Sequence, residues 1–191
     1  MPDTSAPSQS TILQPGHPAP DFTLQSTPGE KVSLADLRGR PVVLIFYPAD
    51  WSPVCGDELA LFNELVSDFH DYGAELIGIS VDGVWCHAAF TRERKLHFPL
   101  LADFEPKGAV SRAYGAYHAD GGTSQRALFL VDQDGVVQWS YLSPMGVNPG
   151  ADGVLSALER LVGRGAPRDA AVREDQTRSA PDSAPRPEPR A

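Results

Sequence analysis

The chain has 191 residues, of which 41% are hydrophobic and 21% are charged, and its formal net charge at pH 7 is −9. This length suffices for a globular domain with its own core, and two cysteines are too few for a disulfide-dependent scaffold. The acidic balance argues against nucleic acid as a partner, because phosphate binding requires clustered Lys and Arg. Residues 1–13 hold no cationic stretch and no long apolar run, so we expect no signal peptide, no membrane span and a reducing, cytoplasmic location.

Composition divides the chain into three regions. We expect a flexible segment at 1–11, one domain at 12–163 and a disordered tail at 164–191. The tail consists mostly of Ala, Pro, Arg, Asp and Glu and has no aromatic residue. It therefore lacks the apolar surface that would offset the entropy lost on ordering.

The first half of the domain shows a hairpin and then alternating buried strands and helices. Pro28-Gly29 marks the hairpin turn, and the continuous apolar run Pro41–Tyr47 is typical of a strand covered on both faces. After Cys55 apolar residues recur at helical spacing as far as Tyr72, and the acids Asp57 and Glu58 suit the first turn of that helix. The predicted elements are a hairpin over 21–34, a helical turn at 34–37, a strand over 41–47, a helix over 55–72 and a strand over 74–81.

The second half continues the alternation and ends in a hairpin and a helix. Asp134-Gly135 is expected to supply the positive φ angles of the hairpin turn. Strand–helix–strand–helix order implies parallel pairing with right-handed crossovers, and the sum is an α/β fold with a mixed sheet and helices on both faces. The predicted elements are a helix over 84–95, a short, edge-like strand over 98–101, a helix over 107–114, hairpin strands over 127–131 and 136–141, and a helix over 152–161.

Cys55 stands where a strand-to-helix loop opens a helix, which makes a thiol reactive. The free N–H groups of the first turn and the helix dipole favour the thiolate. An ordinary cysteine has a pKa of about 8.5, and a nucleophile at neutral pH needs a pKa lower by roughly two, equivalent to about 3 kcal/mol. A helix terminus contributes only about 0.3 to 2 kcal/mol, so a cation must supply the rest. Arg126, at the mouth of an apolar strand, is the candidate, because its fork of donors can bind both the thiolate and a substrate oxygen.

These residues resemble a known family. Pro48, Ser52 and Cys55 match the Pro-x-x-x-(Thr or Ser)-x-x-Cys motif of the peroxiredoxins, the AhpC/TSA family of the thioredoxin-like superfamily, and Arg126 stands where that family places its active-site arginine. The resemblance spans roughly Ile12 to Leu161 and implies a thioredoxin-like three-layer α/β/α sandwich with a mixed central sheet. Further segments that look like the family are Ala19–Phe22, Phe98–Asp103 and Gly108–Gly115.

The resemblance also implies an activity. The Cys55 thiolate would attack the terminal oxygen of a hydroperoxide and become a sulfenic acid. Ser52 would orient the peroxide, Pro48 would shield the pocket and Arg126 would hold the thiolate and stabilise charge on the breaking O–O bond. No cofactor is implied; the partners would be a hydroperoxide, an external thiol reductant (a thioredoxin-like protein or a low-molecular-weight thiol) and a second copy in a homodimer. Ser52 replaces the commoner threonine, and Gly56 follows Cys55 where many members carry threonine.

Cys86 begins the helix predicted over 84–95 and would also lie near a helix N-terminus. A resolving cysteine in that helix would resemble the atypical two-cysteine members, although theirs lies more than a turn further along. The alternative is an inert, packed cysteine, which leaves a one-cysteine enzyme recycled by an outside thiol. No metal site is expected, because the histidines show no ligand spacing: His17, His70, His87, His97 and His118.

Three other functions are weighed against this one. A thioredoxin-type thiol–disulfide oxidoreductase needs Cys-x-x-Cys and a proline before the facing strand, whereas Glu58 occupies the second cysteine's position and Gln125-Arg126 precedes the strand. A non-catalytic redoxin scaffold would not need Ser52, Cys55 and Arg126 intact. A cysteine hydrolase would need a histidine base paired with Cys55, and no histidine is evidently placed for it.

Overall fold

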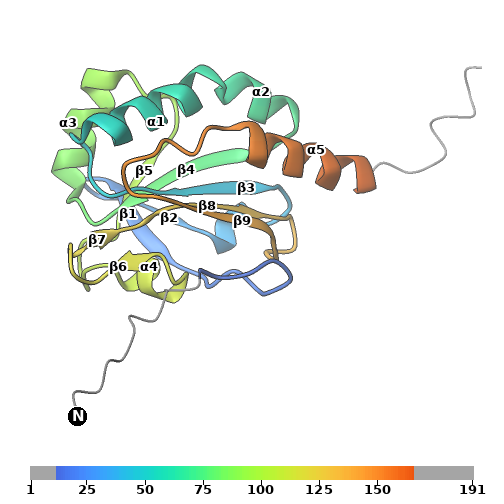
Figure 1. Cartoon of the computed structure of the whole chain (residues 1–191), viewed down its shortest axis with the longest axis horizontal. Coiled ribbons are helices and arrows are strands. Elements are labelled where there is room, and N and C mark those ends of the chain that lie inside the picture. Colours follow the sequence, from blue (N-terminus) through green and yellow to red (C-terminus); the bar gives the residue numbers. More distant parts are fainter. Residues whose placement is uncertain (1–11, 166–191) are drawn as a thin grey trace, which may run out of the picture.

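The structure, a computed structural model, describes residues 12–165, with side chains as far as Gly163. The expected flexible start at 1–11 and residues 166–191 of the expected tail lie outside the described residues, whereas residues 164 and 165 of that tail belong to the last helix of the domain. A seven-stranded mixed sheet in the order β2-β1-β5-β4-β3-β8-β9 forms the centre (Figure 1). Its strands are β1 (Thr23–Thr27), β2 (Glu30–Ser33), β3 (Val42–Phe46), β4 (Glu75–Ser80), β5 (Leu100–Ala102), β8 (Arg126–Val131) and β9 (Val137–Ser143). The remaining elements are η1 (Ala35–Leu37), α1 (Pro53–Glu64), α2 (Val66–Asp71), α3 (Val84–Arg94), α4 (Ala109–Ala113), α5 (Asp152–Gly165) and a small hairpin of β6 (Tyr117–His118) and β7 (Thr123–Ser124).

The central strands of the sheet set the positions of Arg126 and of the loop that leads to Cys55. Strands β3, β4 and β5 run parallel, as expected from the crossover helices between them. Strand β8 pairs antiparallel with β3, and Phe46 lies opposite Ala127. The start of β8 therefore lies beside the end of β3, so Arg126 faces the loop that leads from β3 into α1.

Two hydrophobic layers cover the sheet, one on each face. Alternate residues of β3 point to opposite layers: Val43 and Ile45 to one, Leu44 and Phe46 to the other. Helices α1, α2, α3 and α5 cover the first face, while α4 and the small β6–β7 hairpin lie at the second (Figure 1). The α/β sandwich with a mixed sheet is therefore confirmed, although its two helical layers are unequal.

Strand β5 is not at the sheet edge, contrary to the prediction for 98–101. The hairpin of β1 and β2 pairs onto it, with Gln25 opposite Ala102, and thereby places β5 third in the sheet. A short strand looks like an edge in sequence, but here the hairpin supplies the missing neighbour.

Three local predictions also differ from the structure. The helix expected over 55–72 is two helices, because the Leu65 N–H is shared between the carbonyls of Leu61 and Phe62 and the turn tightens there. Helix α4 is shorter than the range 107–114. In the β8–β9 turn, Gly135 has φ +78° but Asp134 does not have positive φ; the Asp132 carboxylate instead accepts the Asp134 N–H at 3.0 Å. Among the described residues, no helix has both the length and the apolar character required to cross a bilayer.

Candidate active site

The loop after β3 delivers Cys55 into the first turn of α1. Ser52 is the N-cap residue in an extended conformation, and Pro53 follows at the first helical position, where its lack of an N–H costs nothing. The Ser52 carbonyl accepts the Gly56 N–H at 2.8 Å, which fastens the start of the helix. The Ser52 hydroxyl does not cap the helix, so it is not occupied by the first turn.

Arg126 contacts the Cys55 sulfur directly. Its Nη2 donates to Cys55 Sγ at 3.4 Å, and the guanidinium is 1% exposed. The same side chain donates from Nε (3.2 Å) and Nη2 (3.0 Å) to the carbonyl of Met145, which fixes its orientation. A cation held this way in a buried site is little screened by solvent, so it is placed to attract negative charge on the sulfur.

Glu58 is a member of the site that the sequence analysis missed. It was placed among the acids of the first turn, but the structure buries it completely and pairs one of its carboxylate oxygens with Arg126 Nη1. The other oxygen, Oε1, has no hydrogen-bond partner among the described residues. Burial raises the pKa of Glu58 to about 7 despite the opposing effect of Arg126. Its spacing from Cys55, three residues along one helix, was the available signal, since such residues share a helix face.

The charges of the site do not balance when every acid is ionised. The Cys55 thiolate and the Glu58 carboxylate would share one guanidinium, and all three groups are buried. A buried excess of negative charge is costly, so a proton on Glu58 stabilises the thiolate. The cluster is therefore suited to hold one anion, at sulfur, beside one cation.

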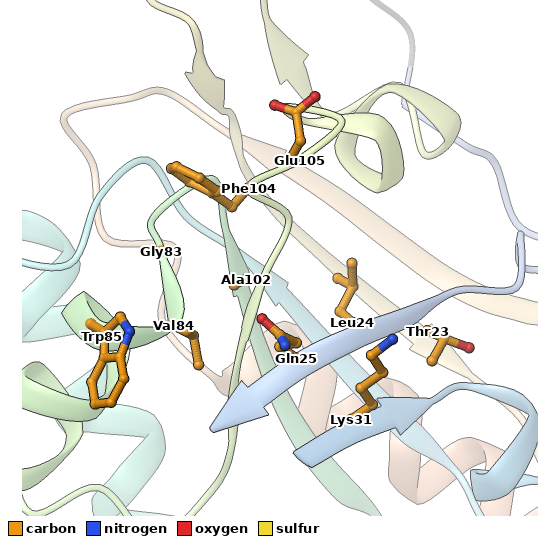
Figure 2. Close-up of a pocket in the computed structure, with 10 residues that line it drawn as sticks. All are labelled: Thr23, Leu24, Gln25, Lys31, Gly83, Val84, Trp85, Ala102, Phe104 and Glu105. Atoms are coloured by element: carbon orange, nitrogen blue, oxygen red, sulfur yellow. The ribbon is translucent and has the colours of Figure 1, made fainter. Parts of the chain in front are cut away.

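The sulfur is covered in this conformation. Cys55 is 0% exposed, while Pro48 and Ser52 are half-buried. A pocket of about 500 Å³ is lined by residues of β1, β5 and the start of α3, and its lining includes Trp85 and Phe104, as Figure 2 shows. None of the four predicted catalytic residues lines that pocket. A reactant therefore reaches the sulfur only when the covering segments move.

Cys86 lies in a different electrostatic environment from Cys55. It is the third residue of α3 and half-buried, and its pKa is raised to about 11 by burial and by its hydrogen bond to, and the charge of, Asp50. The expected influence of the helix N-terminus is thus outweighed. Asp50, Asp82 and Cys86 bring donor atoms within 4.8 Å of one another, the one group of metal-ligand type in the described chain.

Comparison with known proteins decides the family. Residues 15–140 match the family model described as AhpC/TSA family. The chain belongs to the AhpC/TSA family, the peroxiredoxins. It is 34% identical over 152 residues to Peroxiredoxin 2 of Thermoplasma acidophilum, covering 76% of this chain and 75% of that protein. It is 36% identical over 154 residues to a thioredoxin peroxidase of Echinococcus granulosus, covering 75% and 79%.

Solved peroxiredoxins share the fold. The crystal structure of the reduced 2-Cys peroxiredoxin of Plasmodium vivax superposes with a TM-score of 0.74 at 25% identity, covering 80% of this chain and 84% of that one. This likeness confirms the expected thioredoxin-like architecture and family membership. The catalytic roles of Cys55, Ser52, Pro48 and Arg126 stay predictions. The structure of this peroxiredoxin supplies the contacts of the buried thiol on which tests of those roles can be based.

Proposed function

We propose that this peroxiredoxin is a thiol-dependent peroxidase that reduces hydrogen peroxide and alkyl hydroperoxides, with Cys55 as the nucleophile. The observation that carries the proposal is the contact between Arg126 Nη2 and Cys55 Sγ at the first turn of α1. The thiolate attacks the terminal peroxide oxygen, the O–O bond breaks, and its electron pair leaves with the alkoxide or hydroxide, which takes up a proton. The products are the Cys55 sulfenic acid and an alcohol or water.

The neighbouring groups have separate roles in that step. The Ser52 hydroxyl, which does not cap the helix, both accepts the peroxide proton and donates to a peroxide oxygen. Pro48 covers the site without adding a backbone donor. Arg126 holds the thiolate and stabilises the charge that develops along the breaking bond, and Glu58 together with Met145 orients its guanidinium.

Recycling of the sulfenic acid comes from outside the chain. A first thiol condenses with the sulfenic acid to a mixed disulfide and water, and a second thiol then releases Cys55. The raised pKa of Cys86, about 11, leaves that residue almost wholly protonated near neutral pH, which makes it a poor internal resolving thiol. We propose a thioredoxin-like protein or a low-molecular-weight thiol as reductant, a homodimer as the assembly and the cytoplasm as the location.

Peroxide consumption by matched cysteine variants tests the proposal. With dithiothreitol as reductant, Cys55→Ser is expected to consume no hydrogen peroxide above the background rate. Cys86→Ser is the control and is expected to consume it at the wild-type rate. Activity that survives in Cys55→Ser, or that is lost only in Cys86→Ser, contradicts the assignment. Reduction of insulin disulfides by the wild type, without peroxidase activity, would favour a thiol–disulfide oxidoreductase instead.

A further inference from the structure

A second buried ionisable cluster lies behind the active-site loop and has no part in the chemistry described above. Asp50 belongs to the loop between Pro48 and Ser52, and it is 0% exposed. His87, on α3, is 1% exposed and lies with Nδ1 at 3.0 Å from both Asp50 carboxylate oxygens. The cluster therefore joins the loop that carries the predicted peroxide-binding residues to a helix of the scaffold.

Asp50 is held from three sides. The hydroxyl of Tyr47, the residue directly after β3, donates to Asp50 Oδ1 at 2.7 Å. The Asp50 backbone N–H donates to Asp82 Oδ2 at 3.0 Å, and the Ser80 hydroxyl donates to that same oxygen at 2.7 Å. Both the side chain and the backbone of Asp50 are thus fixed. Asp50 lies two positions after Pro48 and two before Ser52.

Only one of the described groups around Asp50 is able to carry a positive charge. Burial and the charge of Asp50 raise the pKa of Tyr47 well above its ordinary value, and the pKa of Cys86 is raised to about 11, so both remain neutral donors. Asp82 adds a second carboxylate. Among the described residues the His87 ring supplies the nitrogen that contacts the Asp50 carboxylate, and a buried carboxyl group that loses a partner is costly in principle.

The His87 ring is committed to this contact. Its Nε2 is buried and has no hydrogen-bond partner among the described residues, so every hydrogen bond of the ring passes through Nδ1. A packing histidine with a general structural role would be expected to satisfy both nitrogens. The ring is therefore placed for the loop aspartate.

We propose that His87 is a positioning residue for peroxide reduction, which holds the loop 48–52 in its reactive geometry through Asp50. The inference rests on the proposed peroxidase function. Loss of the pair removes the contact that fixes the Asp50 side chain to His87 of α3 and leaves the packing of Trp51 on Phe90, so Pro48 and Ser52 are held less firmly near Cys55. The sulfur, which is fully covered in the intact structure, becomes more accessible at the same time.

Two rates with opposite expected changes test the proposal. The first is the second-order reaction of Cys55 with hydrogen peroxide, which requires the ordered loop. The second is alkylation of Cys55 by neutral iodoacetamide at about pH 9, above the ordinary pKa of cysteine, which requires only exposure. Cleavage at glutamate separates the two cysteines for mass spectrometry, because Glu58, Glu64 and Glu75 lie between them.

His87→Leu is expected to react with peroxide about 10- to 100-fold more slowly, the loss typical of a displaced catalytic group, while its Cys55 is alkylated faster. His87→Asn places an amide N–H near the position of Nδ1–H and is expected to recover most of the peroxide rate. Asp50→Asn, which keeps an acceptor for the Tyr47 hydroxyl, is expected to change both rates in the same directions as His87→Leu. Asp50→Asn also provides the test of the proposal if His87→Leu does not fold.

Val137→Ala is the matched control, since Val137 is buried in the core layer on the other sheet face. It destabilises the protein without contact to the loop and is expected to leave the peroxide rate unchanged. The proposal is overturned if His87→Leu and Asp50→Asn keep the wild-type peroxide rate, or if both rates fall together. A wild type that shows no Cys55-dependent peroxide reduction refutes the peroxidase function instead, and the alkylation rates then still report whether the pair holds the loop.

Discussion

Replacement of Glu58 by glutamine tests whether burial keeps a proton on this carboxyl group near neutral pH. The substitution keeps the shape of the side chain and an acceptor for Arg126, but it removes the negative charge. In the wild type, burial raises the pKa of Glu58 from its ordinary value near 4.5 to about 7, because desolvation outweighs the attraction of Arg126. The folded protein therefore binds a proton at Glu58 over a pH range in which the unfolded chain has already lost it.

The direction and size of the effect follow from that difference. Because the folded pKa is the higher one, the stabilising contribution of Glu58 is complete below about pH 4.5 and is lost as pH rises to about 7. A pKa difference of roughly 2.5 corresponds to about 3 kcal/mol. The glutamine side chain has no proton to lose. The free energy of unfolding of Glu58→Gln, taken relative to that of the wild type, should therefore increase by about 3 kcal/mol as pH rises across this range.

Urea unfolding at a series of pH values from about 4.5 to 8 measures this difference. Wild type and Glu58→Gln are compared in a Cys55→Ser background, so that ionisation of the thiol does not contribute. The reasoning is refuted if the two stability curves run parallel. It is also refuted if the free energy of unfolding of the wild type rises relative to that of the variant as pH increases, since that would mean that Arg126 lowers the pKa of Glu58 below its ordinary value.

Three further predictions concern the thiol and its neighbours. Arg126→Ala should slow the reaction of Cys55 with peroxide by about 100- to 1,000-fold, measured by stopped-flow fluorescence, and an unchanged rate would show that another group stabilises the thiolate. Ser52→Ala should also be slow while Ser52→Thr stays near the wild-type rate, because only the hydroxyl acts; equal rates for the two variants would contradict this role. Intact mass after one equivalent of peroxide should show a gain of one oxygen, and a loss of two hydrogens would instead demonstrate a Cys55–Cys86 disulfide.

The sequence predicted the pairing of Cys55 with Arg126 because local patterns identify both positions. Each lies next to a continuous apolar run, and such runs form neighbouring central strands, here β3 and β8. The resemblance of Pro48, Ser52 and Cys55 to the peroxiredoxin motif then implied the chemistry. Local pattern and fold agree at these positions, which is why the prediction needed no coordinates.

The remaining partners depend on packing between distant segments, which local patterns do not record. Glu58 and Arg126 are separated by 68 positions, and Asp50 and His87 by 37. An acid near a helix start is commonly solvated and favoured by the dipole, so the only local sign that Glu58 rather than exposed Asp57 would be buried was its spacing of three residues from Cys55. The place of β5 was missed for a similar reason, since the hairpin that pairs with it comes from the start of the domain, far from β5 in sequence.

The covered sulfur and the two anchored segments around it indicate where the site opens. Arg126 binds the Met145 carbonyl through two donors, so movement of the segment after β9 would break the contacts that orient the guanidinium. Among the described residues the side chains of the loop 48–52 make no hydrogen bond to Arg126 or Cys55, and the loop contacts α3 through Asp50 with His87 and through Trp51 with Phe90. Opening at this loop therefore exposes the sulfur while Arg126 stays in place. A site that opens on this side keeps Arg126 beside the sulfur when a hydroperoxide enters, and the Asp50–His87 contact then returns Pro48 and Ser52 to the positions that the reaction requires.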